Sequence, residues 1–136
     1  MSSITGLNHL TFAVANLERS VAFYSTLLGF SIRMRRSTSA YLEAGTLWLA
    51  LVTDSTVRKG PLPEYSHAAF SVQLSDLAVF AERLTAAGVV HWQESDHAES
   101  FYFLDPDGHK LELHSADLQS RLTARAALRE PGIDHF

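Results

Sequence analysis

The chain has 136 residues, of which 46% are hydrophobic and 19% are charged. This is the composition of an ordinary globular protein with a buried core. The formal net charge is −4 and no basic stripe is visible, which argues against nucleic-acid binding. The sequence contains no cysteine, so disulfides, thiolate metal ligands and a protein thiol nucleophile are excluded. Any thiol chemistry would need a thiol carried by a small co-substrate.

The N-terminal sequence MSSITGLNHL does not have the basic region, apolar run and cleavage site of a signal peptide. No apolar run approaches the roughly 20 residues that a helix needs to cross a bilayer. We therefore expect a cytoplasmic protein that does not enter the membrane.

The first part of the chain predicts a strand, a helix and three further strands. Residues 4–15 alternate in polarity, which predicts a strand with His9 and Thr11 on its polar face. Asn16 is a good N-cap and Gly29 a good stop for a helix between them. Apolar residues recur there at helical spacing: Leu17, Val21, Tyr24 and Leu28. Short strands are predicted at residues 30–35, 39–44 and 46–53.

A polar loop at residues 54–66, with a glycine and two prolines, is the best candidate for a linker. After it a strand is predicted at 67–74, then a helix capped by Ser75 or Asp76 and ended by Gly88. Further strands are predicted at about 89–94, 100–104 and 109–114, with a hairpin turn at Asp105–His109, and a last helix at about 117–128.

The two halves follow the same order, and three residue pairs align directly: His9 with His67, Phe12 with Phe70, and Val14 with Val72. A duplicated β-α-β-β-β unit explains this repetition and the central linker. We therefore predict an α+β fold of paired units in a single domain of residues 1–136. Unit one covers about residues 4–53, and unit two about residues 67–114.

His9 and His67 take the same position at the start of the first strand of each unit. Glu112 is the third candidate metal ligand, because it faces away from its apolar neighbours in the last strand. Aligning Gly45 with Gly108 places Leu49 opposite Glu112, so unit one offers no matching acid. Three protein ligands leave coordination positions open, as in catalytic sites. Two imidazoles and a carboxylate suit Mn, Fe, Zn or Co.

The other candidate residues also have ordinary structural interpretations. His91, His97 and His135 are expected at the surface, His109 in a hairpin turn and His114 at a strand end. Polar and aromatic groups that could surround a metal are Thr11, Trp48, Ser100, Tyr102 and Arg121. Each could equally be a strand former, a core aromatic or an exposed charge, and spacing alone does not select them.

Five segments together carry a resemblance to a known family: GLNHLTFAVANLERSVAFYSTLLGF, AYLEAGTLWLALV, EYSHAAFSV, SFYFLDPDGHKLELH and DLQSRL. They resemble the fosfomycin-resistance thiol transferases of the vicinal oxygen chelate (glyoxalase/bleomycin-resistance) superfamily. The likeness runs from about Gly6 to Leu122. It implies a homodimer that exchanges its paired units, with the N-terminal histidine supplied across the subunit boundary.

On matching positions the resemblance implies metal ligation by His9, His67 and Glu112, usually of Mn(II). Family members add a thiol to the oxirane of fosfomycin and so inactivate the antibiotic. Thr11 matches a hydroxyl that contacts the oxirane oxygen. The groups that match phosphonate contacts are Ser100, Tyr102 and Arg121, and the aromatic positions near the substrate are Trp48 and Tyr65.

Two positions depart from the family pattern. Gln93 stands where a lysine normally grips the phosphonate. The loop SDHAES, residues 95–100, is shorter than the potassium-binding loop of glutathione-using members, which makes potassium activation doubtful. The resemblance favours glutathione as the thiol, with bacillithiol as the alternative.

Three alternatives from the same superfamily remain open. An Fe(II) ring-cleaving dioxygenase would use two histidines and a carboxylate and a further acid–base histidine, for which His114 is the candidate. A metal-dependent epoxide hydrolase would need a glutamate base near Ser39, where no acid is present. A drug-sequestering binding protein would have no need of the His9, His67 and Glu112 set.

Overall fold

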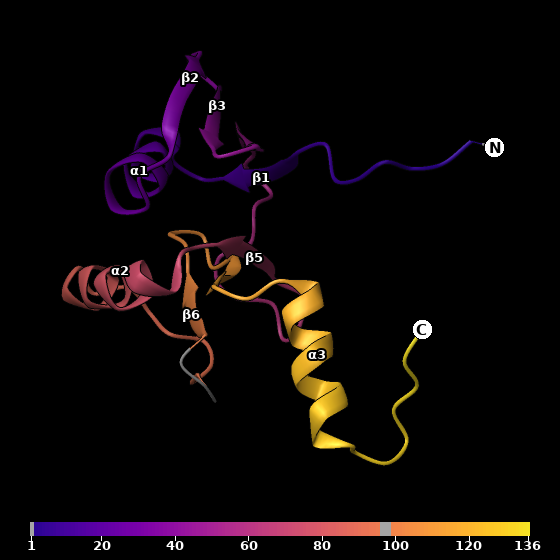
Figure 1. Ribbon diagram of the computed structural model, residues 1–136. Helices are drawn as coiled ribbons and strands as arrows, with labels where there is room; N and C mark the ends of the chain where they lie inside the picture. Colours follow the sequence, from indigo (N-terminus) through magenta and orange to yellow (C-terminus); the bar gives the residue numbers. More distant parts are fainter. Residues whose placement is uncertain (1, 96–98) are drawn as a thin grey trace.

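The structure, a computed structural model, describes residues 2–95 and 99–136. Figure 1 shows two lobes that correspond to unit one and unit two, with the linker running between them. The elements of unit one are β1 (Leu10–Val14), α1 (Leu17–Ala22), the π-helical turn η1 (Phe23–Leu27), β2 (Ser31–Arg35), β3 (Ser39–Ala44) and β4 (Leu47–Thr53). Those of unit two are β5 (Ala68–Ser71), α2 (Leu74–Ala86), β6 (Ser100–Leu104) and β7 (Lys110–His114).

Each unit builds one sheet, and the two sheets have the same plan. Unit one has the strand order β1-β4-β3-β2, and unit two has the order β5-β7-β6. In both, the first strand lies parallel to the last strand of the unit, and the remaining pairs are antiparallel. The expected α+β fold of paired units is confirmed, and among the described residues unit two has one strand fewer than unit one.

Three expectations about the elements were wrong. The first strand begins at Leu10 instead of residue 4. Residues 89–94 form no strand: a single backbone bond, from Leu104 N to Val90 O (2.9 Å), ties them to β6. Beyond it the Trp92 indole donates to the Leu111 carbonyl (2.9 Å). A side chain, and not the backbone, therefore makes this contact with β7. Helix α2 starts at Leu74 after Gln73, so neither Ser75 nor Asp76 is its cap.

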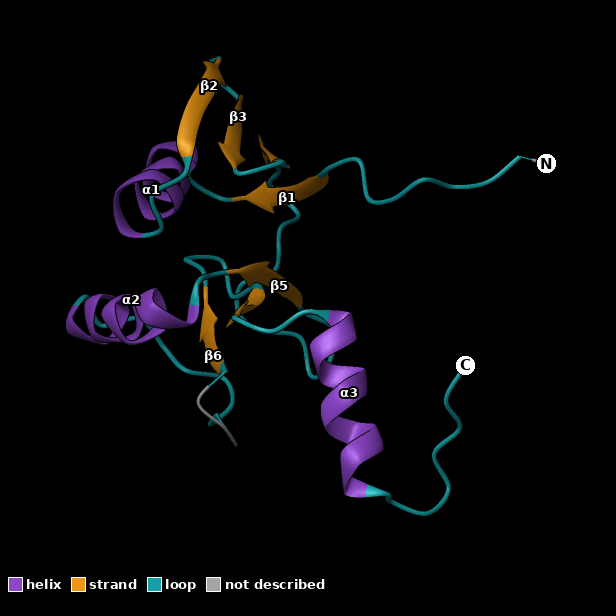
Figure 2. Ribbon diagram, viewed as in Figure 1, coloured by secondary structure: helices purple, strands orange, loops and turns teal. Residues whose placement is uncertain are grey.

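A single apolar core joins the two units. Helices α1 and α2 lie on the same side of the molecule, each against the sheet of its own unit (Figure 2). The aromatic rings of Phe30 and Phe70 meet at 5.4 Å, and those of Phe23 and Phe103 at 6.3 Å, so aromatic contacts cross from unit to unit. These four side chains belong to one continuous cluster of buried residues. The shared core fixes the relative position of the two sheets.

The hairpin turn between β6 and β7 makes a second connection between the units. The Asp107 carboxylate accepts from the Ala15 amide (3.0 Å), the Arg19 guanidinium (3.2 Å) and the Ser20 hydroxyl (3.4 Å) at the start of α1. In the same turn Gly108 has φ +93°, and a Cβ there would lie 2.5 Å from the backbone of Gly60. The linker therefore packs closely against this turn.

Helix α3 (Leu118–Leu128) leads away from both sheets, as Figure 1 shows. Asp117 caps it, since its carboxylate accepts from the Ser120 amide (2.7 Å) and the Ser120 hydroxyl lies 3.1 Å from the Asp117 amide. None of its residues is buried. Within residues 2–95 and 99–136 no helix is both long and apolar enough to span a membrane.

Candidate metal centre and substrate site

The predicted ligands His67 and Glu112 meet in unit two. His67 directly precedes β5, and Glu112 lies in the middle of β7, which pairs with β5. His67 Nε2 lies 2.9 Å from Glu112 Oε1, while its Nδ1 lies 3.0 Å from the Tyr65 carbonyl. A carbonyl oxygen only accepts, so that contact places a proton on Nδ1 and directs Nε2 toward the carboxylate. The structure thus brings two of the three proposed ligands within contact distance of each other.

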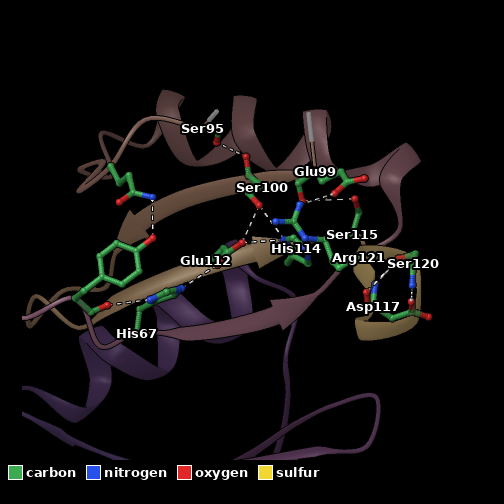
Figure 3. Close-up of polar contacts among 12 residues, drawn as sticks. His67, Ser95, Glu99, Ser100, Glu112, His114, Ser115, Asp117, Ser120 and Arg121 are labelled. Atoms are coloured by element: carbon green, nitrogen blue, oxygen red, sulfur yellow. Dashed lines mark hydrogen bonds and ion pairs between the residues drawn. The ribbon is translucent and has the colours of Figure 1, made fainter. Parts of the chain in front are cut away.

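The second oxygen of Glu112 is also engaged. Oε2 accepts from the Ser100 hydroxyl at 2.7 Å and from His114 Nδ1 at 2.9 Å, as Figure 3 shows. Glu112 is only 6% exposed although it faces away from the core residues Leu111 and Leu113. A buried carboxylate needs such donors, because the cost of removing it from water must be offset by hydrogen bonds. This polar network covers the outer face of the unit-two sheet.

The remaining metal candidate, His9, lies in a separate group on unit one. Its ring packs against Trp48 at 4.4 Å, and its Nδ1 lies 2.7 Å from the side-chain oxygen of Asn8. Thr11 follows on the same strand and pairs with Ala50 of β4. His9 and Thr11 are both exposed. One chain therefore carries two partial sites, with His9, Thr11 and Trp48 on unit one and His67 and Glu112 on unit two.

The strand registers correct one alignment between the units. Leu10 pairs with Leu49 in unit one, and the equivalent Ala68 pairs with Leu111 in unit two. The residue equivalent to Glu112 is therefore Ala50, and the glycine-based match with Leu49 was wrong by one residue. The two hairpin turns differ in length, so their glycines are not equivalent positions. Unit one still offers no acid at this point.

Two of the expected substrate contacts, Tyr65 and Tyr102, lie beside His67. The Tyr65 ring lies 5.1 Å from the His67 ring, and the Tyr102 ring lies 6.1 Å from it. Tyr102 is also paired with Glu112 across β6 and β7. Gln93, at the position where the family pattern has lysine, donates through Nε2 to the Tyr65 hydroxyl (3.1 Å). These side chains form a polar and aromatic rim around the two candidate ligands.

Arg121 reaches this region from helix α3. Its guanidinium lies 3.5 Å from the Glu99 carboxylate, next to Ser100 in sequence. Both side chains are 43% exposed, so the ion pair is weak and can exchange with another anion. The loop of residues 95–100 was compared with a potassium-binding loop in the sequence. Residues 96–98 of this loop lie outside the described part of the chain.

A cavity of about 250 Å³ lies beside His67, between β1 and β5. Leu10 and Phe12 line it from unit one, and its wall carries two cations, Arg58 and Lys110, and one acid, Glu64. A larger cavity of about 550 Å³ lies at the start of α1, with Arg19 and Asp54 in its wall and none of the candidate ligands. Of these two cavities, the smaller one has the candidate ligand His67 in its wall.

Sequence reasoning missed the buried cluster of Asp105, Asp107 and His109. Within the described residues, these three side chains have the spacing of a possible metal site, because one ligand atom of each lies within 4.8 Å of the others. Its oxygens are already occupied, since Asp105 accepts from the Tyr24 hydroxyl (2.7 Å) and from His109 Nδ1 (2.7 Å). The cluster therefore acts as a hydrogen-bonded joint between the units. The Asp-Pro-Asp-Gly-His turn was its signal in the sequence.

Burial and hydrogen bonding shift two pKa values in this joint. Burial raises the pKa of Tyr24 well above its ordinary value, and the negative charge of Asp105 raises it further. Burial acts on Asp105 in the same upward direction, but hydrogen bonds from His109 and Tyr24 and the charge of His109 outweigh it. The pKa of Asp105 is therefore lowered. Both shifts favour a neutral tyrosine beside a charged aspartate.

The spacing of the unit-two pair fits a metal ion. Neighbouring ligands at right angles, each about 2.1 Å from one ion, stand roughly 3 Å apart. His67 Nε2 and Glu112 Oε1 are 2.9 Å apart. Because His67 Nδ1 donates its proton to the Tyr65 carbonyl, Nε2 is the nitrogen that can coordinate a metal. An imidazole and a carboxylate without thiolate match Mn(II) and similar divalent ions.

Comparison with known proteins assigns the fold to a class. The family model described as the Glyoxalase/Bleomycin resistance protein/Dioxygenase superfamily matches residues 6–113. The chain belongs to this superfamily, as the resemblance of its sequence segments implied.

Two of its relatives are transferases by name. The chain is 47% identical over 124 residues to glutathione transferase FosA of Serratia marcescens, covering 89% of this chain and 88% of the relative. It is 35% identical over 125 residues to metallothiol transferase FosB of Staphylococcus haemolyticus, with 88% and 90% covered.

Crystal structures of fosfomycin resistance protein FosX from Listeria monocytogenes resemble the fold. One superposes with a TM-score of 0.77 at 26% identity, covering 90% of this chain and 99% of that one. Another, of a point mutant complexed with Mn(II) and 1S,2S-dihydroxypropylphosphonic acid, has a TM-score of 0.75 at 26% identity and covers 89% and 99%. The metallothiol name and this complex associate a divalent metal with the relatives.

Proposed function

We propose that this chain is a metal-dependent thiol transferase that adds a small thiol to the epoxide of fosfomycin and inactivates it. The observation that carries the proposal is the 47% identity, over 89% of the chain, to a glutathione transferase FosA. The proposal is also supported by the 2.9 Å spacing of His67 and Glu112, which suits two ligands of one metal ion. Ring-cleaving dioxygenase, epoxide hydrolase and drug-binding functions are not favoured, because the relatives at 35–47% identity are named as thiol transferases.

The proposed metal ligands are His9, His67 and Glu112, with Mn(II) as the preferred ion. His67 and Glu112 have ligand spacing within one chain, whereas His9 stands with Trp48 on the other unit. We propose that His9 comes from the second subunit of a homodimer. This assignment is supported by the exposed aromatic side chains beside His9, since Tyr41 and Trp48 are each 37% exposed. In this dimer the single domain of residues 1–136 is the repeating subunit.

The reaction joins the thiol sulfur to an oxirane carbon while the C–O bond of that carbon breaks, and the thiol proton ends on the new hydroxyl. When bound, the metal supplies a Lewis acid for the substrate oxygens. The Thr11 hydroxyl donates a hydrogen bond where negative charge develops. Arg121 exchanges the Glu99 carboxylate for the phosphonate, a partner that suits its fork of donors. Tyr102 orients the same group, and Ser100, whose one hydroxyl proton goes to Glu112 Oε2 (2.7 Å), borders it.

Aromatic side chains close the site. Trp48 from unit one and Tyr65 from unit two would border the substrate and exclude water, which strengthens the polar contacts inside. Gln93 holds the Tyr65 hydroxyl at 3.1 Å and adds no positive charge. We therefore expect real activity with fosfomycin, but weaker phosphonate binding than with a lysine at this position. Glutathione is the favoured thiol and bacillithiol the alternative; potassium activation stays doubtful, and the enzyme would act in the cytoplasm.

The test is turnover of fosfomycin by Mn-loaded protein with glutathione, bacillithiol or water, with products identified by mass spectrometry. A thiol adduct is expected, and Arg121→Ala should nearly abolish it. Gln93→Lys should lower the apparent KM by roughly ten- to a hundredfold, the value of a charge-assisted hydrogen bond of about 1.5–3 kcal/mol. Absence of an adduct with both thiols, in the wild type and in Gln93→Lys, would reject fosfomycin as the substrate. A diol formed from water alone would favour the hydrolase.

A further inference from the structure

The carboxylate of Glu112 is held from both sides, and the two sides differ. Its Oε1 faces His67, the partner with which it would share a metal. Its Oε2 is enclosed by Ser100 and His114, which are themselves in contact, since the Ser100 hydroxyl lies 2.8 Å from His114 Nδ1. Figure 3 shows this triangle beside the His67 contact. One oxygen is thus directed at the metal position and the other is fixed by protein.

The direction of the hydrogen bonds follows from the chemistry of the groups. An ionised carboxylate only accepts, so the Ser100 hydroxyl and His114 Nδ1 both donate to Oε2. The Nδ1 proton of His114 is shared, because the Ser100 oxygen is 2.8 Å away and Glu112 Oε2 is 2.9 Å away. Two donors on one oxygen stop the carboxylate from rotating. Oε1 then remains in the direction of His67 without further ordering.

The backbone places His114 for this contact. It is the last residue of β7, where it pairs with Ser71 of β5 and with Ser100 of β6. Its carbonyl also accepts from the Val72 amide at 3.1 Å. Neighbouring strands on both sides therefore hold its main chain. The side chain reaches Glu112, two residues back on the same strand face, as the pleat of a strand requires.

Unit one provides an internal comparison. There Ser39 pairs with Val52 and Tyr41 with Ala50, where unit two pairs Ser100 with His114 and Tyr102 with Glu112. Serine and tyrosine are present in both units, whereas the acid and the histidine occur together in only one. The histidine thus accompanies the acid and not the serine.

We propose that His114 is a positioning residue that, together with Ser100, orients Glu112 toward the metal. The proposal rests on the proposed function, because it requires Glu112 to be a ligand. Hydrogen-bond partners of metal-ligating groups typically contribute about 10- to 100-fold to metal affinity. We expect an effect of that size here, since the network leaves Glu112 only 6% exposed.

The experiment measures Mn(II) affinity of the purified protein without substrate, from the electron paramagnetic resonance signal of free Mn(II). His114→Ala is expected to weaken binding by about 10- to 100-fold. His114→Asn keeps an N–H donor close to the place of Nδ1 and should recover most of the affinity. His114→Phe keeps the ring without the donor and should resemble alanine. His91→Ala removes an exposed histidine of unit two away from Glu112 and should leave affinity unchanged.

A second readout separates positioning from catalysis. At saturating Mn(II), His114→Ala should regain a kcat close to the wild-type value, because only the metal affinity is changed. Equal losses in the alanine and asparagine variants, with matching falls in melting temperature, would overturn the proposal in favour of a purely structural role. Full Mn(II) affinity in Glu112→Gln would instead reject the metal site itself. Loss in Glu112→Gln without loss in His114→Ala would reject only the positioning role.

Discussion

Unit one and unit two have the same sheet plan, yet their outer faces differ in chemistry. Strand β7 of unit two carries Glu112 and His114. The equivalent strand β4 of unit one carries Ala50 and Val52 in the same register. The inner faces are alike, since both units contribute leucines with no exposed surface to one core. The repeated fold therefore depends on the inner face, whereas the site depends on a few outer positions that can diverge freely.

The largest expected effect concerns the acid that only unit two has. Glu112→Gln should lower Mn(II) affinity more than 100-fold, since loss of a charged ligand exceeds the roughly 10- to 100-fold cost of losing a supporting group. Adding Ala50→Glu to this variant should not restore binding, because Val52 offers no donor to orient the new carboxylate. Isothermal titration calorimetry measures both variants. Restored affinity in the double variant would show that the units are chemically interchangeable.

The two hairpin turns give the next largest difference. A Cβ at Gly108 (φ +93°) would lie 2.5 Å from Gly60 and 2.7 Å from Pro61, while one at Gly45 (φ +57°) would meet nothing within 4 Å. Gly45→Ala should cost about 1 kcal/mol, from positive φ alone. Gly108→Ala should cost about 3 kcal/mol, because overlap with the linker backbone adds to it. Urea denaturation of both variants tests this; equal costs would mean that the linker can move aside.

A smaller effect is expected at the joint, where Tyr24 of unit one meets Asp105 of unit two. Tyr24→Phe should cost about 1.5–3 kcal/mol, the value of a hydrogen bond to a charged group. Since the pKa of Tyr24 is raised, its contribution is fully present below about pH 10 and is lost as the pH rises further. Since the pKa of Asp105 is lowered, its contribution is lost as the pH falls below about 4.

The measurement for the joint is urea unfolding, followed by circular dichroism, of the wild type and Tyr24→Phe across this pH range. The difference between them should be constant near neutrality and narrow at both extremes. Tyr41→Phe, on the partly exposed face of β3, is the matched control and should show no such profile. A difference that stays unchanged above pH 10 would contradict the raised pKa.

The smallest effect is expected at the surface of unit one. Arg33 and Glu43 form an ion pair at 2.9 Å, with side chains 65% and 47% exposed. Arg33→Ala should cost no more than about 1 kcal/mol, because water and salt screen exposed pairs. High salt should remove most of that difference in thermal melts. A larger, salt-independent loss would indicate that this arginine also packs against the sheet.

Much of the fold could be predicted from local patterns. The N-cap at Asn16 and the last helix from Asp117 are confirmed, because capping depends on residues close in sequence. The strand expected at residues 89–94 was wrong, since the Val90 carbonyl and the Trp92 indole tie the segment to the sheet without a backbone ladder. Local β-propensity alone does not show whether such an apolar segment joins a sheet by its backbone.

The candidate site was only partly predictable. The repeat singled out His67 and the strand alternation singled out Glu112, and the structure places their side chains 2.9 Å apart. His114 and His109 were interpreted as a strand end and a turn residue, yet both make contacts with carboxylates. Those contacts depend on strand register and on turn length, which local sequence patterns do not determine. The same uncertainty caused the one-residue error between Leu49 and Ala50.

The separation of His9 from its own Glu112 has a genetic consequence. In the proposed dimer each site takes His9 from one chain and His67 and Glu112 from the other. Protein carrying His9→Ala and protein carrying Glu112→Ala should each be inactive alone. Co-expressed, they should complement each other: random pairing leaves about a quarter of all sites with a full set of ligands, since each mixed dimer has one intact and one doubly altered site.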